Sequence, residues 1–345
     1  MKLSMPLSYA GGLKESAQQA AALEKAGLDT VWVAEAYGFD AVSLMGYLAA
    51  VTETVEIGAA ILPIYTRTPT LLAMTAAGVD ALSDGRCILG LGASGPQVIE
   101  GFHGVPYTKP LTRTREIVDI CRQVWARERV TYQGSAYTLP LPPEQGTGLG
   151  KPLKLITRPV RERIPIYVAA LGPRNVRMTA EVADGWLPLF FLPEKVDDVW
   201  GADLAAGTAA RAADLAPLEI AAGGLLAVGD DAASYRDLAR PMIALYVGGM
   251  GAKGRNFYND LACRYGFADD AAKIQDLYLD GHKHEAAAAV PDGLLEAATI
   301  CGPEGYVRDR ITAFKEAGVT SLNVTPIAED VPALVTRLKD WVTHA

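Results

Sequence analysis

Residues that could take part in catalysis follow short apolar runs in this 345-residue sequence. Glu35 comes directly after Thr30–Ala34 (TVWVA), and Tyr65-Thr66-Arg67 follows the run at 55–62. Glu35 has the chemistry of a general acid or base, with capping of the next helix as the structural alternative. Arg67 could hold a ligand or pair with a neighbouring acid, and the sequence favours neither.

Two further loops have unusual composition. Residues 93–97 (ASGPQ) follow the apolar run Cys87–Leu91, and residues 170–174 (ALGPR) follow the run Ile164–Ala169. Glycine followed by proline is typical of a turn that opens a helix. In a closed parallel barrel both loops would follow the carboxyl ends of strands, where the site is expected, so both are candidate site segments.

Gly90, Gly92 and Gly95 spell GxGxxG after a strand, which is the pattern of a dinucleotide-binding fold. That fingerprint normally belongs to the first strand of its unit and opens a helix at once. Here it falls on the fourth predicted strand and runs into Pro96. We therefore interpret these glycines as positions where a flat ligand approaches the backbone.

The elements that must position these residues alternate between buried strands and amphipathic helices. Eight strands are predicted, at 2–8, 30–34, 55–62, 87–91, 164–169, 185–190, 218–228 and 320–325. Continuously apolar strands joined by helical crossovers favour a closed parallel barrel over an open sheet. The predicted fold class is thus α/β, a (β/α)8 TIM barrel, with the site at the carboxyl ends of its strands.

We expect a single domain over 1–345 with insertions near 127–163 and 248–290. The first region is rich in Gly and Pro, and the second is an irregular helical stretch that opens with Gly248-Gly249-Met250-Gly251. This glycine-rich stretch lacks the ordered GxxxxGK[ST] of a P-loop. Lys253 and Arg255, which follow it, are expected in a solvated turn.

Composition and charge exclude several classes of protein. The chain is 50% hydrophobic and 21% charged, with a net charge of −8, so nucleic acid and anionic membranes are not expected as partners. The four cysteines form no CxxC pair, and His282 and His284 are the only close histidines, which predicts no metal site. No secretion signal and no 18-residue apolar run is visible, so a cytoplasmic location is expected.

Four segments resemble the bacterial luciferase-like flavin and deazaflavin enzymes, which are built on a (β/α)8 barrel. They are GLDTVWVAEAYGFD near 27–40, IGAAILPIYTRTP at 57–69, LSDGRCILGLGASGPQVIEGFHG at 82–104 and IPIYVAALGPRNVRMTAEVADGW at 164–186. The YTRTP segment and the GLGASGPQ loop are most similar to the branch that uses coenzyme F420, an 8-hydroxy-5-deazaflavin. That branch includes methylenetetrahydromethanopterin reductase, and the alternative is a flavin mononucleotide (FMN) monooxygenase.

The resemblance implies a cofactor site at the carboxyl rim. It implies a bulge in the third strand, with a non-proline cis peptide between Ala60 and Ile61 behind the ring. It also implies a ring edge lined by the loop at 93–97 and a phosphate-bearing tail near the helix start at 169–174. The implied cofactor-binding residues are Ala60, Ile61, Gly92, Ala93, Ser94, Gln97, Ala169, Ala170, Leu171, Gly172 and Arg174.

The resemblance also implies that Glu35 is the catalytic residue. Position 36 is Ala, whereas relatives acting on glucose 6-phosphate carry a catalytic histidine there, and the loop at 95–97 lacks their second acid. With few acid–base groups, hydride transfer to an activated double bond or an imine-like carbon of a small-molecule substrate is favoured over alcohol oxidation. Relatives are commonly dimers, so a homodimer is expected.

Three other side chains are given structural roles. His103 lies beyond the loop at 93–97, and packing or helix capping is favoured over proton donation. Trp32 and Trp186 lie in predicted strands and are expected in the core rather than against a ligand.

Overall fold

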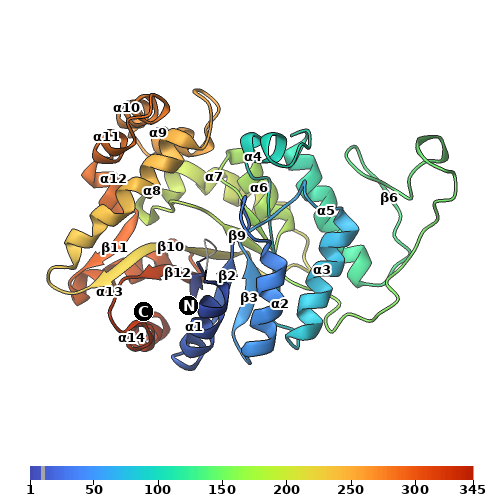
Figure 1. Cartoon of the computed structure of the whole chain (residues 1–345), viewed down its shortest axis with the longest axis horizontal. Coiled ribbons are helices and arrows are strands. Elements are labelled where there is room, and N and C mark those ends of the chain that lie inside the picture. Colours follow the sequence, from blue (N-terminus) through green and yellow to red (C-terminus); the bar gives the residue numbers. More distant parts are fainter. Residues whose placement is uncertain (9–11, 345) are drawn as a thin grey trace.

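Eight parallel strands close into a barrel ringed by helices (Figure 1). The computed structural model describes residues 1–8 and 12–344. The strands of the barrel are β1 (Lys2–Pro6), β2 (Thr30–Val33), β3 (Glu56–Ala59) with its continuation β4 (Leu62–Pro63), β5 (Cys87–Gly92), β8 (Ile166–Ala169), β9 (Gly185–Leu187), β10 (Glu219–Val228) and β12 (Ser321–Pro326). The predicted (β/α)8 fold is confirmed.

The barrel closes because every one of these strands has a parallel neighbour on each side. Lys2 of β1 lies opposite Ser321 of β12, and Glu219 of β10 lies opposite Gly185 of β9. Since all carboxyl ends of a parallel barrel meet at one rim, loops distant in the sequence lie around one opening.

The helices that follow the strands cover the outside of the barrel. They are α1 (Leu13–Lys25), α2 (Ala41–Val51), α3 (Pro69–Leu82), α4 (Pro96–Gly101), α5 (Pro110–Trp125), α6 (Pro173–Val182), α7 (Ala202–Ala209), α13 (Glu304–Glu316) and α14 (Val331–His344). Three begin with side-chain caps, one of which is on α14, where the Asp330 carboxylate accepts the Ala333 N–H at 3.0 Å. The Asp40 carboxylate accepts the Ser43 N–H of α2 at 3.0 Å, and the Thr68 hydroxyl accepts the Leu71 N–H of α3 at 3.3 Å.

Between β10 and α13 the chain forms a group of short helices. It also forms one strand, which the sequence did not predict. The helices are α8 (Arg240–Ala244), α9 (Phe257–Arg264), α10 (Ala268–Leu279), α11 (Lys283–Ala288) and α12 (Asp292–Ala297). The additional strand, β11 (Thr299–Gly302), pairs with Leu225–Val228 at the carboxyl end of β10. It therefore extends the sheet beyond the eight barrel strands.

Residues 127–163 run outside the ring of helices. They contain only the two-residue strands β6 (Tyr132–Gln133) and β7 (Thr138–Leu139) and a short helical turn at Pro143–Gln145. Figure 1 shows this green segment projecting from the barrel beside α5. Its first part is fastened to α5, because the buried Glu116 carboxylate accepts backbone N–H groups of Ser135, Ala136 and Tyr137.

The barrel interior has its own small apolar cluster. Trp32, Ile88, Tyr167 and Ala221 pack together there, with the Trp32 and Tyr167 rings 5.5 Å apart. Neighbouring glycines make room for the rings, since a Cβ at Gly58 would lie 2.2 Å from Trp32. Trp32 is buried as expected, and Trp186 is buried in the outer core. Within the described residues, no helix is both long and apolar enough to cross a membrane.

Candidate functional site at the carboxyl rim

The third strand carries a bulge at the rim. Gly58 lies opposite Ile88 of β5, whereas Leu62 lies opposite Leu91, so four residues on one strand match three on the other. One extra residue in a strand is the definition of a bulge. The peptide bond between Ala60 and Ile61, inside this bulge, is cis, as the resemblance implied.

The glycines of the GxGxxG pattern have a role different from the one expected. A Cβ at Gly90 would lie 1.7 Å from the Ala59 carbonyl oxygen, and one at Gly92 would lie 2.6 Å from Cγ1 of Ile61. The bulged strand itself fills the space beside these buried glycines. For Gly90 and Gly92 the interpretation as backbone left open to a flat ligand is therefore corrected, because they permit close contact between strands instead, while for Gly95 it stays a prediction. A cofactor contact at Gly92 remains a prediction.

Glu35 lies just beyond β2 and is held by three donors. Its Oε1 accepts from Nη1 of Arg67 at 2.6 Å, and its Oε2 accepts from Nη2 of Arg67 at 2.8 Å and from the Ala41 N–H at 2.9 Å. The Glu35 carboxylate also raises the pKa of the Arg67 guanidinium. Of the two possibilities left open for Arg67, the structure contains the ion pair. Glu35 caps α2 as well, while its catalytic role remains a prediction.

The loop at 93–97 is supported by tyrosines from two other segments. Ser94 has a positive φ of 56°, and its carbonyl oxygen accepts from the Tyr107 hydroxyl at 3.3 Å. The Tyr107 ring lies 5.1 Å from that of Tyr65, whose hydroxyl donates to the Thr108 carbonyl at 2.9 Å. Burial raises the pKa of both phenols, so they remain neutral donors. Gln97 at the end of the loop is exposed.

Carbonyl groups of the segment 169–174 accept hydrogen bonds from buried tryptophans. The Ala170 carbonyl accepts from the Trp186 indole at 2.9 Å, and the Leu171 carbonyl accepts from the Trp200 indole at 2.8 Å. Gly172 precedes α6 at the N-cap position and provides no side-chain cap, and Arg174 is exposed in the first turn. The start of this ten-residue helix thus keeps backbone N–H groups that no side chain caps.

The order of strands brings most of the predicted residues to one side of the rim. β2, β3, β5 and β8 are consecutive around the barrel. Their carboxyl ends carry, in the same order, Glu35, the Ala60–Ile61 bulge, the loop at 93–97 and the segment 169–174. Ala60, Ala93 and Ala169 are only partly buried at these ends.

Sequence reasoning missed an aromatic group at the rim. Phe190 follows β9 with a positive φ of 54°, which is unusual for a bulky residue. Its ring lies 5.7 Å from Tyr246 and 6.3 Å from Tyr258, and those two rings are 4.7 Å apart. Burial raises the pKa of Tyr258, with smaller contributions from Tyr246 and from Tyr107 in the segment after β5. The only sequence signal was the FF pair at 190–191.

The remaining candidates have structural contacts. The His103 ring lies edge-on to Phe102, with centroids 5.1 Å apart, and Lys253 pairs with Asp276 at 2.5 Å. His282 contacts Glu285 at 3.2 Å. Within residues 1–8 and 12–344, no group of three His, Cys, Asp or Glu side chains is placed to hold a metal ion.

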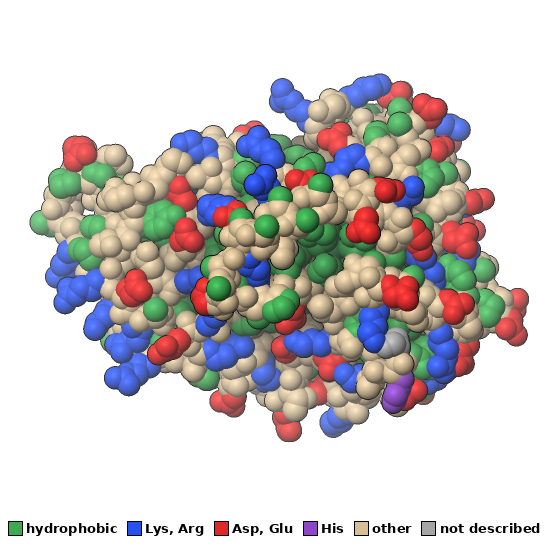
Figure 2. Space-filling model, turned by 180° about the vertical axis from the view of Figure 1, so that it is seen from behind, with side chains coloured by type: hydrophobic (Ala, Val, Ile, Leu, Met, Phe, Trp, Pro, Cys, Tyr) green, Lys and Arg blue, Asp and Glu red, His purple; other side chains and the backbone are tan. Residues whose placement is uncertain are grey.

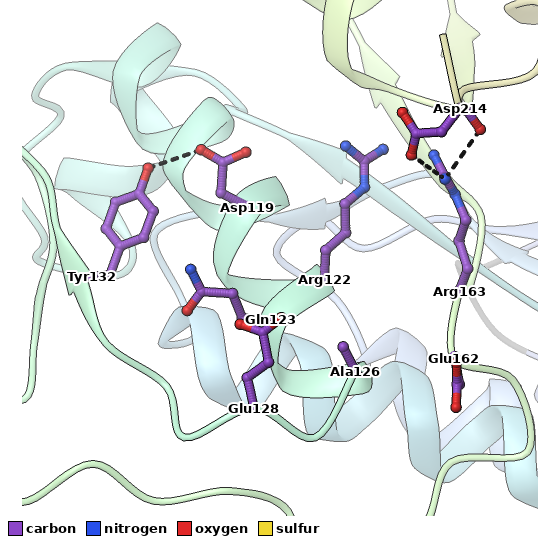
Figure 3. Close-up of a pocket in the computed structure, with 9 residues that line it drawn as sticks. All are labelled: Asp119, Arg122, Gln123, Ala126, Glu128, Tyr132, Glu162, Arg163 and Asp214. Atoms are coloured by element: carbon purple, nitrogen blue, oxygen red, sulfur yellow. Dashed lines mark hydrogen bonds and ion pairs between the residues drawn. The ribbon is translucent and has the colours of Figure 1, made fainter. Parts of the chain in front are cut away.

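A separate cavity of about 530 Å³ lies between the end of α5 and the chain before β8 (Figure 3). This is the amino end of the barrel strands, opposite the rim. Figure 3 shows Arg163 directed at Asp214 and Tyr132 at Asp119, with contacts of 3.2 Å and 2.9 Å. Arg122 donates to the Val182 carbonyl at 2.7 Å. Because these groups pair with protein atoms, we interpret the cavity as structural.

The fold and the rim define a (β/α)8 protein whose candidate site lies on the bulged third strand and its neighbours. The profile of the luciferase-like monooxygenase family matches residues 2–321, and the chain belongs to that family.

Three relatives illustrate the membership. A Mycobacterium tuberculosis protein, provisionally named a coenzyme F420-dependent oxidoreductase, is 44% identical over 94% of this chain and 95% of its own. The 5,10-methylenetetrahydromethanopterin reductase of Archaeoglobus fulgidus is 28% identical over 89% and 88%. The solved coenzyme F420-dependent tetrahydromethanopterin reductase of Methanopyrus kandleri superposes with a TM-score of 0.82 at 21% identity, covering 99% of this chain and 98% of that one, which shows the shared fold.

Proposed function

We propose that the chain is a coenzyme F420-dependent oxidoreductase that transfers a hydride between C5 of the deazaflavin and a small organic substrate. The relative that is 44% identical over nearly the whole chain supports this cofactor. The observation that carries the proposal is the set of small, partly exposed residues on adjoining strands of the rim. Ala60, Ala93 and Ala169 leave room there for a flat ring.

The residues present fit such a group. Beneath the rim, the Trp32 indole N–H is buried without a hydrogen-bond partner, which is costly unless something polar reaches it. Beside the rim, the uncapped start of α6 at Gly172 and the exposed Arg174 suit an anionic tail. Small residues for the ring and helix N–H groups for the tail therefore lie on one side of the barrel.

The chain itself contributes mainly orientation and exclusion of water. When bound, coenzyme F420 supplies the hydride chemistry. Glu35 accepts three hydrogen bonds from protein donors, so its role in the first instance is to hold Arg67 and the start of α2 in place. Phe190, Tyr246 and Tyr258 would form an apolar wall against the substrate, and positioning of this kind lowers the barrier.

Separate titrations of the purified chain with F420 and FMN, followed by cofactor fluorescence, test the proposal. We expect a micromolar Kd for F420 and binding of FMN at least about tenfold weaker. The reverse order would overturn the proposal and favour an FMN-dependent monooxygenase, the alternative that the family description supports. Binding of neither cofactor would favour a non-enzymatic binding protein.

A matched pair of variants tests where the tail binds. Replacement of the exposed Arg174 by Gln removes a cation beside the start of α6 and should weaken F420 binding by about tenfold. Replacement of the exposed Lys273 on α10 by Gln removes the same charge away from the rim strands and should leave the affinity unchanged. Equal affinities in both variants would place the tail elsewhere.

A further inference from the structure

The two phenylalanines after β9 have different surroundings. Phe191 is 1% exposed and stacks on Phe314 in the core, with ring centroids 6.0 Å apart. Phe190, with its φ of 54°, is only partly buried. A positive φ at a bulky residue is costly, and residues held in this way are concentrated at ligand sites. The backbone of Phe190 therefore indicates a role beyond packing.

The conformation of Phe190 is fixed from α9. Tyr265 directly follows this helix, is buried, and donates its hydroxyl proton to the Phe190 carbonyl at 2.7 Å. Arg264, the last residue of α9, donates to the Leu171 carbonyl at 3.2 Å. The end of α9 thus contacts both Phe190 and the segment 169–174, which contains predicted cofactor-binding residues.

The rings of Phe190, Tyr246 and Tyr258 form one compact wall. Tyr258 lies on α9, and Tyr246 lies in the helical turn Leu245–Gly249. The three rings are nearly perpendicular to one another, with interplanar angles of 88°, 82° and 81°. Centroid separations of 4.7 to 6.3 Å are those of rings in edge-to-face contact. A ligand therefore meets the outer surface of the wall rather than a space between its rings.

The surroundings of the wall are apolar. Figure 2 shows Lys, Arg, Asp and Glu side chains spread over the face of the molecule turned to the reader. By contrast, residues 187–192 (LPLFFL) contain no ionisable side chain. Leu187 and Ala60 both pack on the apolar cluster inside the barrel. A charged group bound here would lose its hydration without gaining a partner from these residues.

We propose that the substrate carries a flat, uncharged aromatic or conjugated group, and that Phe190 and Tyr258 select it. The inference rests on the proposed function, because the deazaflavin would cover the other face of that group. Aromatic rings favour stacked or edge-to-face contact with other rings beyond what their buried area supplies. A saturated ring gains less from such a wall, and a sugar phosphate or a carboxylate is excluded by its charge.

Isothermal titration calorimetry of the chain saturated with oxidised F420 tests the substrate class without measuring turnover. Three bicyclic probes of similar size are compared: 2-naphthol is flat and neutral, 2-naphthoate is flat and anionic, and trans-2-decalol is neutral and saturated. We expect 2-naphthol to bind at least about tenfold more tightly than either of the others. No binding of 2-naphthol, or equal or tighter binding of another probe, would overturn the proposal.

Variants of the wall test which residues select the ring. Phe190→Leu and Tyr258→Leu should each weaken 2-naphthol binding by about tenfold, whereas Tyr258→Phe keeps the ring and should keep the affinity. Tyr47→Leu is the control, because Tyr47 is 39% exposed on α2, outside the barrel, and its loss should change nothing. Wild-type affinity in both leucine variants would overturn the assignment, and circular dichroism shows whether each variant is folded.

The F420 affinity of the same variants separates this inference from the one on which it rests. We expect the Kd for F420 to change by less than about twofold in Phe190→Leu and Tyr258→Leu. A loss of F420 binding as large as the loss of 2-naphthol binding would place these rings against the cofactor and overturn their role in selection. Failure of the wild type to bind F420 would reject the proposed function and this inference with it. Equal affinities for the three probes with F420 bound would reject this inference alone.

Discussion

Glu35 and Arg67 form a two-point ion pair that joins the end of β2 to the segment after β4. The distances are 2.6 Å between Oε1 and Nη1 and 2.8 Å between Oε2 and Nη2, and the two side chains are 8% and 14% exposed. A contact in which two guanidinium nitrogens meet two carboxylate oxygens fixes the relative orientation of the two groups as well as the distance between them. The pair therefore sets the position of the rim next to the bulged third strand.

Removing one partner of this pair should destabilise the protein. Arg67→Met leaves the Glu35 carboxylate nearly buried without its cation, and we expect a loss of about 3 kcal/mol in the free energy of unfolding. Glu35→Gln should cost a similar amount. Urea unfolding of both variants and of the double variant gives the coupling energy between the two residues. A coupling energy near zero would contradict the structural role of the pair.

The same variants separate structure from catalysis at Glu35. If Glu35 only positions Arg67, turnover with saturating F420 and substrate should fall equally in Glu35→Gln and Arg67→Met. If Glu35 exchanges a proton in the reaction, Glu35→Gln should lower kcat by a further factor of about 100 and remove a limb of the pH profile. We expect equal losses, because the carboxylate accepts hydrogen bonds from three protein donors.

A second ion pair fastens the chain before β8 to the barrel. The Asp80 carboxylate is fully buried and accepts from the Cys87 N–H at 3.1 Å and from the Arg161 guanidinium. Arg161→Met leaves this carboxylate without its cation, so the free energy of unfolding should fall by about 3 kcal/mol. Arg158→Met provides the control, because Arg158 is exposed and should change stability by less than about 0.5 kcal/mol. Equal Tm values for the two variants would contradict the prediction.

Strand order and the bulge could be predicted because they follow from local pattern and family resemblance. Apolar runs separated by helices predict a parallel barrel, and the residues 57–69 resemble a segment that carries the bulge. β11 could not be predicted in this way. Its four residues, Thr299–Gly302, follow a helical stretch, and they become a strand only because the carboxyl end of β10 offers a free edge. No local property of the sequence predicts this free edge of β10.

Side-chain partners distant in the sequence were also beyond prediction. Arg67 could have met a ligand or an acid, and only the folded barrel brings it to Glu35. Phe190, Tyr246 and Tyr258 come from separate segments, so their cluster depends on how the loops after β9 and β10 fold over the rim. The glycines at 90 and 92 were noticed, but their neighbour proved to be the bulged strand.

Gly90 should tolerate no side chain. Gly90→Ala places a Cβ 1.7 Å from the Ala59 carbonyl oxygen, a contact with backbone that cannot move aside cheaply. We expect loss of soluble protein or a fall of several kcal/mol in the free energy of unfolding. Gly46→Ala is the matched control, since nothing lies within 4 Å of its Cβ in the middle of α2. That variant should gain about 0.5–1 kcal/mol from helix propensity. Wild-type stability in Gly90→Ala would refute the packing argument.

Ionisation of the Cys87 thiol should lower the free energy of unfolding at high pH. Burial, with a smaller contribution from the Asp80 carboxylate, raises the pKa of its thiol to about 12, whereas an unfolded cysteine ionises near pH 8.5. Between these two values the unfolded chain releases a proton that the folded chain retains. Ionisation therefore favours unfolding, and this group should lower stability by about 1.4 kcal/mol per pH unit above pH 9.

Guanidinium unfolding of wild type and Cys87→Ala at pH 8, 9 and 10 measures this contribution. Lost packing should lower the free energy of unfolding of Cys87→Ala by the same amount at every pH. With rising pH, however, this free energy should fall less steeply than in the wild type, by about 1.4 kcal/mol per pH unit above pH 9. Parallel profiles would show that the thiol ionises equally in both states. A thiol reagent at pH 8 gives an independent reading, because the partly exposed Cys263 should react in the native protein while the buried Cys87 reacts only after unfolding.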